Sequence, residues 1–293
     1  MNPAPTVFRD ARAILGESLV LDDTAPAPAL LWCDISAGLL HRSELAGDPG
    51  GADDTVWALP APLASFHRAL VTGGPGYVAS LGDRVVLVDD GGAIVRELAR
   101  IDHAHPGLRL NEGKVDPLGN WVTGSMDLTR GAPDGAFYSV TPAGDVRVIA
   151  GGLGTSNGLE WSLDGTRVYF TDTAVGTIYT GDYSADGEIS DVEVFHRGDM
   201  NDGLAIDADG WLWSSIYGDG VVVRYDTQGV ERERHGFEVP NLTSVAFAGS
   251  TLYVASAREN LTEEQLLQHP LSGAVFALET GTTGRAGRVF VTA

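Results

Sequence analysis

The sequence repeats one turn motif at an interval of about 45 residues, and this interval restricts the possible folds more than any other feature. Residues 115–119, 161–165 and 206–210 each begin with an apolar residue and end with glycine after a short turn. Each is followed by a segment in which apolar and polar residues alternate, which is the pattern of a half-buried strand. A repeat of this length is typical of proteins built from similar units of a few strands or helices.

Each full unit contains four short predicted strands. In the three clearest copies the strands after the turn are predicted at 121–124 and 135–140, at 167–171 and 176–183, and at 211–215 and 220–225. Weaker copies begin near Leu19, Ala69 and Ser244. We therefore predict an all-β, six-bladed β-propeller with four antiparallel strands per blade, formed by residues 1–293 as a single domain. The alternatives, a β-sandwich or two small barrels, do not require so long a repeat.

Composition narrows the partners that the protein can bind. The formal net charge of −21 repels phosphate backbones, so no nucleic acid is expected, whereas cations and neutral small molecules are favoured. Cys33 is the one cysteine, which excludes an intrachain disulfide and a zinc site made of thiolates. No secretion signal is recognisable and no apolar stretch approaches the roughly 18 residues that span a bilayer, so we expect a cytoplasmic protein without a membrane partner. We expect a monomer or a weak homodimer.

Polar residues occupy the same slot in several units. The slot five residues before the turn holds Glu17, Asn111, Asn157, Asp202 and Ser244. If this slot begins the innermost strand of each blade, its side chains point into the mouth of the central channel. Carboxylate and amide oxygens are the ligands that Ca²⁺, Mg²⁺ and Mn²⁺ prefer. Asn157 or Asp202 alone fits an ordinary turn, and Glu17 alone fits a solvated charge. It is their joint recurrence at the repeat interval that predicts a metal site.

One motif points to a different chemistry. Residues 154–158 match the G-x-S-x-G pattern of serine hydrolases. That pattern requires a helix after the serine, whereas a strand is predicted here. We therefore do not expect Ser156 to be a nucleophile.

Several motifs together resemble the senescence marker protein/gluconolactonase/luciferin-regenerating enzyme family, which includes regucalcin and bacterial sugar lactonases. The resemblance covers nearly the whole chain. It is carried by residues 15–17, 31–35, 40–42, 109–117, 124–127, 156–159, 169–173, 202–205 and 256–258.

The resemblance implies a site for one divalent metal ion. The candidate metals are Ca, Zn, Mn, Mg and Fe. Its ligands would be Glu17, Asn157 and Asp202, the same three residues that the repeat indicates. Arg109 and Asn111 would contact the hydroxyl groups of a substrate. Asp202 would also be the catalytic general base.

The implied activity is hydrolysis of a sugar lactone, such as a gluconolactone, to the sugar acid. In this hypothesis the metal ion polarises the lactone carbonyl and lowers the pKa of water. The alternatives are a metal-dependent aryl esterase or organophosphate hydrolase, and a calcium-binding propeller without catalytic activity.

The sequence departs from the family pattern in its substrate motifs. Glu112 replaces the aspartate that usually follows Asn111, and Asp127 begins the stretch where some relatives place a glutamate against the sugar. We include both as candidate substrate-binding residues, and we expect the loop 126–133 to cover the site.

Overall fold

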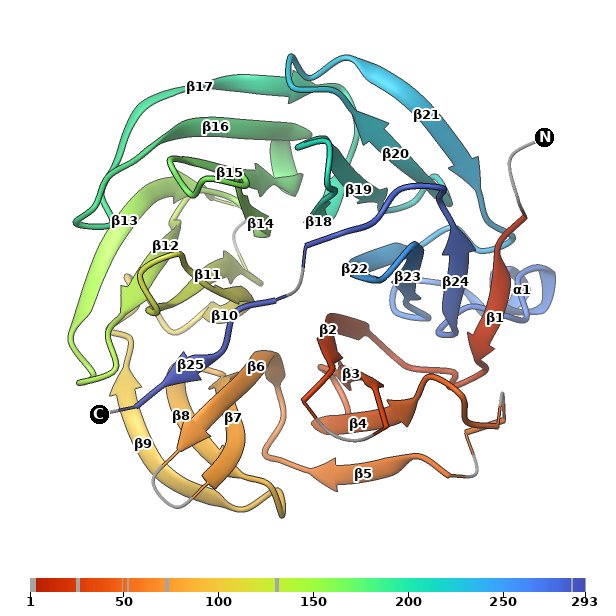
Figure 1. The fold of residues 1–293 in the computed structure, drawn as a ribbon, viewed down its shortest axis with the longest axis horizontal. Coiled ribbons are helices and arrows are strands. Elements are labelled where there is room, and N and C mark those ends of the chain that lie inside the picture. The colour runs from red at the N-terminus through yellow and green to blue at the C-terminus, as the bar shows by residue number, and fades with distance from the viewer. Residues whose placement is uncertain are drawn as a thin grey trace.

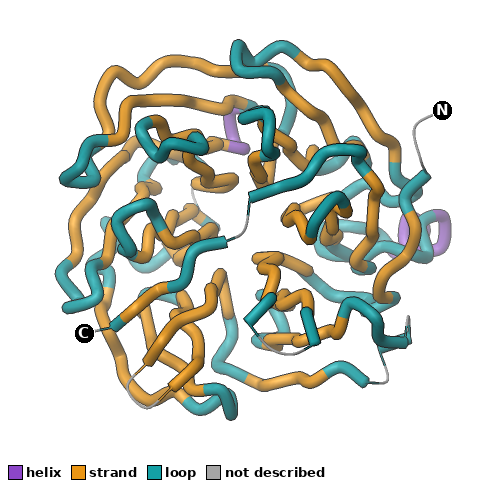
Figure 2. The backbone as a smooth tube through the Cα atoms, in the orientation of Figure 1, coloured by secondary structure: helices purple, strands orange, loops and turns teal. Residues whose placement is uncertain are grey.

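The computed structural model describes residues 4–24, 27–48, 50–51, 53–71, 74–129, 132–285 and 287–292. Strands dominate these residues, and they form six small sheets arranged as a ring (Figures 1 and 2). Five sheets have four strands and one has five. The predicted six-bladed propeller is therefore confirmed.

Each blade runs from an inner strand beside the channel to an outer strand at the rim. The inner strands are β2 (Gly16–Asp22), β6 (Leu63–Val71), β10 (Leu108–Val115), β14 (Ser156–Trp161), β18 (Asn201–Ile206) and β22 (Leu242–Ala248). The second strands are β3 (Ala29–Asp34), β7 (Gly74–Leu81), β11 (Trp121–Asp127), β15 (Arg167–Asp172), β19 (Leu212–Ile216) and β23 (Thr251–Ser256). The third strands are β4 (Leu39–Glu44), β8 (Arg84–Asp89), β12 (Gly135–Val140), β16 (Thr177–Tyr183), β20 (Val221–Tyr225) and β24 (Val275–Glu279). The outer strands are β5 (Thr55–Ala58), β9 (Ile94–Arg100), β13 (Val146–Leu153), β17 (Ile189–Arg197), β21 (Glu231–Gly236) and β1 (Thr6–Arg9).

The repeated turn joins the inner strand of a blade to its second strand. In the turn at 116–119, Asp116 Oδ1 accepts hydrogen bonds from the backbone N–H groups of Leu118 and Asn120, both at 2.8 Å. Gly119 has a φ of 87°, a backbone conformation that favours glycine. The turn at 207–210 is built in the same way, with Asp207 Oδ1 accepting from the backbone. These local bonds explain why the motif recurs once per blade.

The two ends of the chain close the ring, which the repeat did not predict. β1 supplies the outer strand of the last blade by pairing antiparallel with β24 (Figure 1). Residues 280–285 and 287–292, which we call the C-terminal strap, cross from that blade to β25 (Phe290–Val291). β25 pairs in parallel with β6 and makes the fifth strand of that sheet.

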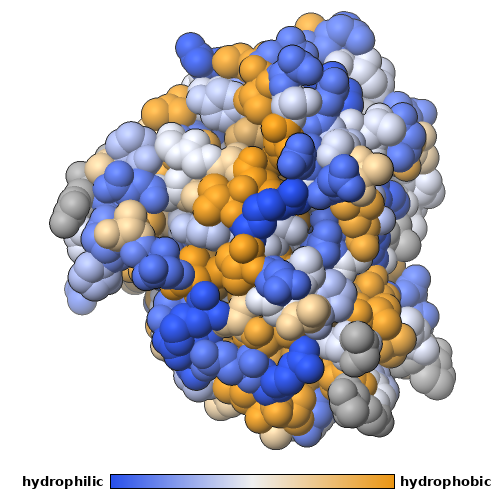
Figure 3. Space-filling view, turned by 90° about the vertical axis from the view of Figure 1, so that its left-hand side faces the viewer, coloured by the Kyte–Doolittle hydropathy of each residue, from blue (hydrophilic) through white to orange (hydrophobic). Residues whose placement is uncertain are grey.

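Apolar side chains fill the space between neighbouring blades. Trp32, Trp121, Trp161 and Trp213 are all less than 2% exposed and lie among branched aliphatic residues. The outer strands carry isolated exposed valines, such as Val148 on β13, which is 58% exposed. One side of the ring accordingly shows small hydrophobic patches among hydrophilic residues (Figure 3). Scattered patches of this kind are ordinary on protein surfaces.

Helices are minor elements of the described chain. α1 (Glu263–Gln268) begins with a capping box between Thr262 and Gln265, and η1 (Thr173–Val175) follows β15. No helix among the described residues has the length and apolar character needed to cross a membrane.

Arg9 joins the last blade to the first and provides a test of ring closure. It is 2% exposed, its Nε lies 3.0 Å from Asp54 Oδ1, and its Nη2 donates to the carbonyl of Glu44 at 2.9 Å. Arg9→Ala leaves a buried carboxylate without its cation, so we expect a loss of about 3–5 kcal/mol in the free energy of unfolding, measured by denaturant titration. Arg12→Ala is the control, because the Arg12 side chain is 68% exposed. Equal stability of the two variants would contradict this account of closure.

Candidate metal and substrate site

A β-bulge interrupts the inner strand of every blade near the predicted slot. The pairing register with the second strand shifts between Glu17 and Val20, Leu63 and Ser65, Leu110 and Gly113, Asn157 and Leu159, Asn201 and Leu204, and Leu242 and Val245. A bulge leaves a residue outside the ladder and redirects its side chain. The sequence repeat therefore marks a position where the backbone is distorted in each blade.

One pocket, at the end of the channel where these bulges lie, contains five of the predicted site residues. A cavity of about 190 Å³ is lined by Glu17, Arg109, Asn111, Asn157 and Asp202, together with other residues. Glu17 comes from the first blade and Asp202 from the fifth, so the ring is what brings these two carboxylates into one pocket.

Hydrogen bonds order the amide side chains of the pocket. Arg109 Nη1 donates to Asn111 Oδ1 at 2.7 Å, and Asn111 Nδ2 donates to Asn157 Oδ1 at 2.9 Å. Asn157 Nδ2 in turn donates to Thr173 Oγ1 at 3.2 Å. These bonds fix the Asn157 amide with its oxygen accepting one bond, which leaves a second lone pair for a cation.

Two carboxylates of the pocket, those of Glu17 and Asp202, are held in an environment that disfavours their charged forms. Burial, followed by repulsion from Glu112, raises the pKa of Glu17 from 4.5 to about 8. Burial, followed by repulsion from Glu17, raises the pKa of Asp202 well above its ordinary value. Asp202 is 4% exposed, and its Oδ1 is buried without a hydrogen-bond partner in the described part of the protein. A divalent cation between these oxygens would stabilise the charged forms of both carboxylates and would give Asp202 Oδ1 a partner. The residues therefore fit a metal ion.

Glu112 and Asp127 do not line this pocket. Glu112 lines a separate cavity further along the channel, and its Oε1 accepts the backbone N–H of Gly113 at 2.7 Å. Its influence on the site is electrostatic, through the pKa of Glu17. Asp127, at the end of β11, is buried and accepts from the backbone N–H of Thr129 at 2.8 Å. In the loop expected to cover the site, Met126 lines the pocket, whereas residues 130 and 131 lie outside the described residues.

Asp127 also belongs to a group of three potential metal ligands. His105 Nε2 lies 3.7 Å from an oxygen of Asp127 and 3.5 Å from one of Asp134. However, His105 Nδ1 accepts the backbone N–H of Gly107 at 3.1 Å, which places the proton of the neutral ring on Nε2. This tautomer offers the carboxylates a hydrogen and offers a metal ion no lone pair. These three residues are therefore better suited to attach the loop that follows β11 than to bind a metal ion.

Sequence reasoning missed three residues that line the pocket: Tyr217, Glu259 and Asn260. Asn260 Nδ2 donates to the hydroxyl oxygen of Tyr217 at 3.1 Å, and the Asn260 backbone has a positive φ of 64°. Glu259 Oε2 accepts from Ser36 Oγ at 3.1 Å. The one sequence signal was the motif 256–258, which ends directly before Glu259 and Asn260; no motif marks Tyr217.

The fold and the pocket together define a class: a six-bladed propeller with a polar, cation-compatible site at one end of its channel. Comparison with known proteins narrows this class. The model of the SMP-30/Gluconolactonase/LRE-like region matches residues 15–258, and the chain therefore belongs to this family.

Relatives of the chain match it along nearly their whole length. An L-arabinolactonase of Azospirillum brasilense is 32% identical over 290 residues, which cover 96% of this chain and 93% of that protein. A 6-deoxy-6-sulfogluconolactonase of Pseudomonas putida is 32% identical over 286 residues, 95% of each chain. The crystal structure of regucalcin from Agrobacterium tumefaciens, described as a calcium-binding protein, has a TM-score of 0.88 at 28% identity and covers 99% of this chain and 97% of its own.

The raised pKa of Glu17 predicts how the metal-free protein responds to pH. Above its ordinary pKa of 4.5 the unfolded chain has released this proton, whereas the folded protein keeps it to about pH 8. Unfolding therefore releases a proton between these two pH values, so the folded protein loses stability as the pH rises through this range. We expect Glu17→Gln to have a higher melting temperature than the wild type in EDTA, with a difference that grows from about pH 5 to pH 8.

The wild type must be compared with Glu17→Gln, because buried histidines change the stability with pH in the opposite direction. Burial lowers the pKa of His41 and of His67, so these residues make the protein more stable as the pH rises to about 6.5. A divalent cation should raise the melting temperature of the wild type and leave Glu17→Gln nearly unchanged. If the difference in melting temperature between the two proteins, measured in EDTA, does not depend on pH, then the Glu17 carboxyl is not held in its protonated form.

Proposed function

We propose that this protein is a divalent-metal-dependent hydrolase that opens a sugar lactone to the sugar acid. The observation that carries the proposal is the buried, unpartnered oxygen of Asp202 in one pocket with Glu17, Asn157 and Arg109. The lactonases among its relatives support the substrate class.

The proposed metal ligands are Glu17, Asn157 and Asp202. Their oxygens are the donor set that hard divalent cations prefer, and water would complete the coordination shell. The calcium-binding relative supports Ca²⁺, while Zn²⁺, Mn²⁺, Mg²⁺ and Fe²⁺ are the other candidates. When bound, the ion would supply positive charge to the lactone carbonyl and increase the acidity of water.

The protein side chains have separate roles in this proposal. Asp202 accepts the proton of the attacking water, since its oxygen is buried and has no competing donor. The donors of Arg109 and the amide of Asn111 hold the sugar hydroxyl groups, and the bond between these two residues orients both for that purpose. Tyr217 and Asn260, which line the same pocket, are further candidate hydroxyl contacts.

Asp202 provides the first test of the proposal. We expect Asp202→Asn to lower kcat for lactone opening by about 10²–10⁴-fold, the contribution of a general base, and also to weaken metal binding. Asp102→Asn is the matched control, because Asp102 is exposed and does not line the pocket. Near wild-type turnover by Asp202→Asn would refute the assigned role.

The substrate class is tested by a panel of lactones and esters. We expect hydrolysis of five- and six-membered aldonolactones that stops on chelation and returns with a divalent metal, and weak or no hydrolysis of aryl esters and organophosphates. Arg109→Met should raise KM for lactones more than for aryl esters, because only the sugar presents several hydroxyl groups. Metal binding without hydrolysis of any of these compounds would favour a non-catalytic calcium-binding propeller.

A further inference from the structure

The end of the channel opposite the candidate site holds a separate cavity. The C-terminal strap and all six inner strands line this cavity, whose volume is about 60 Å³. A Cβ atom at Gly284 would collide with the ring of Phe247, and one at Gly287 would lie 3.0 Å from His67 Nε2. These two glycines therefore let the strap lie directly against β22 and β6.

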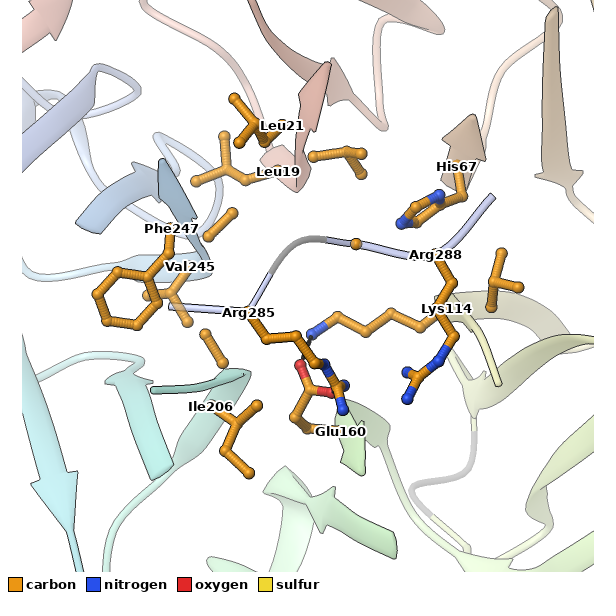
Figure 4. A pocket seen from close by; sticks show the side chains of 15 residues that line it. Leu19, Leu21, His67, Lys114, Glu160, Ile206, Val245, Phe247, Arg285 and Arg288 are labelled. Atoms are coloured by element: carbon orange, nitrogen blue, oxygen red, sulfur yellow. Dashed lines mark hydrogen bonds and ion pairs between the residues drawn. The ribbon is translucent and has the colours of Figure 1, made fainter. Parts of the chain in front are cut away.

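Three basic side chains and one carboxylate meet at this cavity (Figure 4). Lys114 Nζ lies 3.0 Å from Glu160 Oε2, and Arg285 of the strap is paired with the other oxygen of Glu160. Lys114 also donates to the carbonyl of Leu204 at 2.6 Å, and Arg285 Nη1 donates to the carbonyl of Ser162 at 3.1 Å. Because an ammonium has three donors and a guanidinium five, both residues keep donors for another acceptor.

Arg288 is the third basic residue, and it forms no hydrogen bond or ion pair with any residue that the structure describes. Burial, followed by repulsion from Arg285, lowers its pKa. The nearby carboxylate of Asp116 already accepts from the Tyr183 hydroxyl at 2.6 Å and from its own turn. Arg288 therefore lacks the acidic partner that a partly buried guanidinium normally has.

His67 also lines this cavity, and one of its ring nitrogens lacks a hydrogen-bond partner among the described residues. It is 5% exposed, and its Nδ1 is buried without a partner in the described part of the chain. Burial, followed by repulsion from Arg68 and Lys114, keeps the ring neutral by lowering its pKa to about 3. A neutral imidazole has one N–H group, which can donate to an anion from this buried position.

The local charge is opposite to that of the whole protein. Lys114, Arg285 and Arg288 carry three positive charges against the one negative charge of Glu160, an excess of two. The formal net charge of the chain is −21. A doubly charged anion in the cavity would balance this excess and satisfy the free donors at once.

We propose that this cavity binds a small tetrahedral oxyanion, such as phosphate or sulfate, between Arg288, Lys114, Arg285 and His67. The size of the cavity suits a single ion of this kind and excludes a sugar. The proposal concerns the far end of the channel and does not depend on lactone hydrolysis. An anion there would also fasten the strap to β6 and β10.

Titration of inorganic phosphate and sulfate into the full-length protein tests the proposal. EDTA is present throughout, so that the anions cannot act through a metal at the other end, and sodium chloride keeps the ionic strength constant. We expect a saturable rise in melting temperature with either oxyanion and heat of binding by calorimetry, without a rise for equal additions of chloride. Arg288→Gln should weaken binding by at least about tenfold, the loss of one charge-assisted contact.

Further variants separate binding from folding. Arg288→Lys keeps the charge and should retain part of the affinity, and His67→Gln tests the second donor independently. Arg96→Gln is the control, because Arg96 is exposed on β9 and should not alter binding. The proposal is overturned if neither oxyanion binds saturably, or if Arg288→Gln and His67→Gln both bind as the wild type does.

Discussion

The burial of Glu17 and Asp202 in one pocket is the constraint on which the proposed chemistry of this protein depends. The two carboxylates come from different blades; burial raises the pKa of both, and repulsion from Glu17 raises that of Asp202 further. Such an arrangement costs folding free energy unless a cation joins it. The bulges in the inner strands bring about this proximity, since they turn side chains out of the sheet and into the channel. The folded protein thus has a lower free energy of unfolding than it would have without these two carboxylates, and in return it has a pocket that fits a cation.

Four inner strands, β2, β10, β14 and β18, carry different chemistry at their two ends. On β10, Asn111 lies at the oxygen-rich pocket and Lys114 at the basic cavity. On β14, Asn157 and Glu160 are placed in the same way. The hydrogen bond from Asn111 to Asn157 and the ion pair from Lys114 to Glu160 therefore connect the same two blades twice. Because the strap closes one end, small molecules reach the proposed catalytic site from the other.

Much of this arrangement could be predicted from local sequence. The turn at 116–119 specifies its own hydrogen bonds, so it revealed the blade repeat, and the polar slot before it identified four residues that share a pocket. The bulges could not be predicted, because strand register depends on the neighbouring strand. Tyr217 and Asn260 lie in loops between strands, where no repeat marks them. β1 and β25 were missed because each is a single strand that lacks the rest of the unit.

The position of β1 has a consequence for how the chain is made. Thr6 pairs with Ala277, so β1 acquires its partner only after the strands β2 to β24 have been synthesised. Until then β1 is an unpaired edge, and the first five blades have nothing to hold them in a circle. Contacts between residues so distant in sequence form slowly, since a long loop must close first. Circularly permuted chains that begin between two blades would place all four strands of the last blade in one continuous segment.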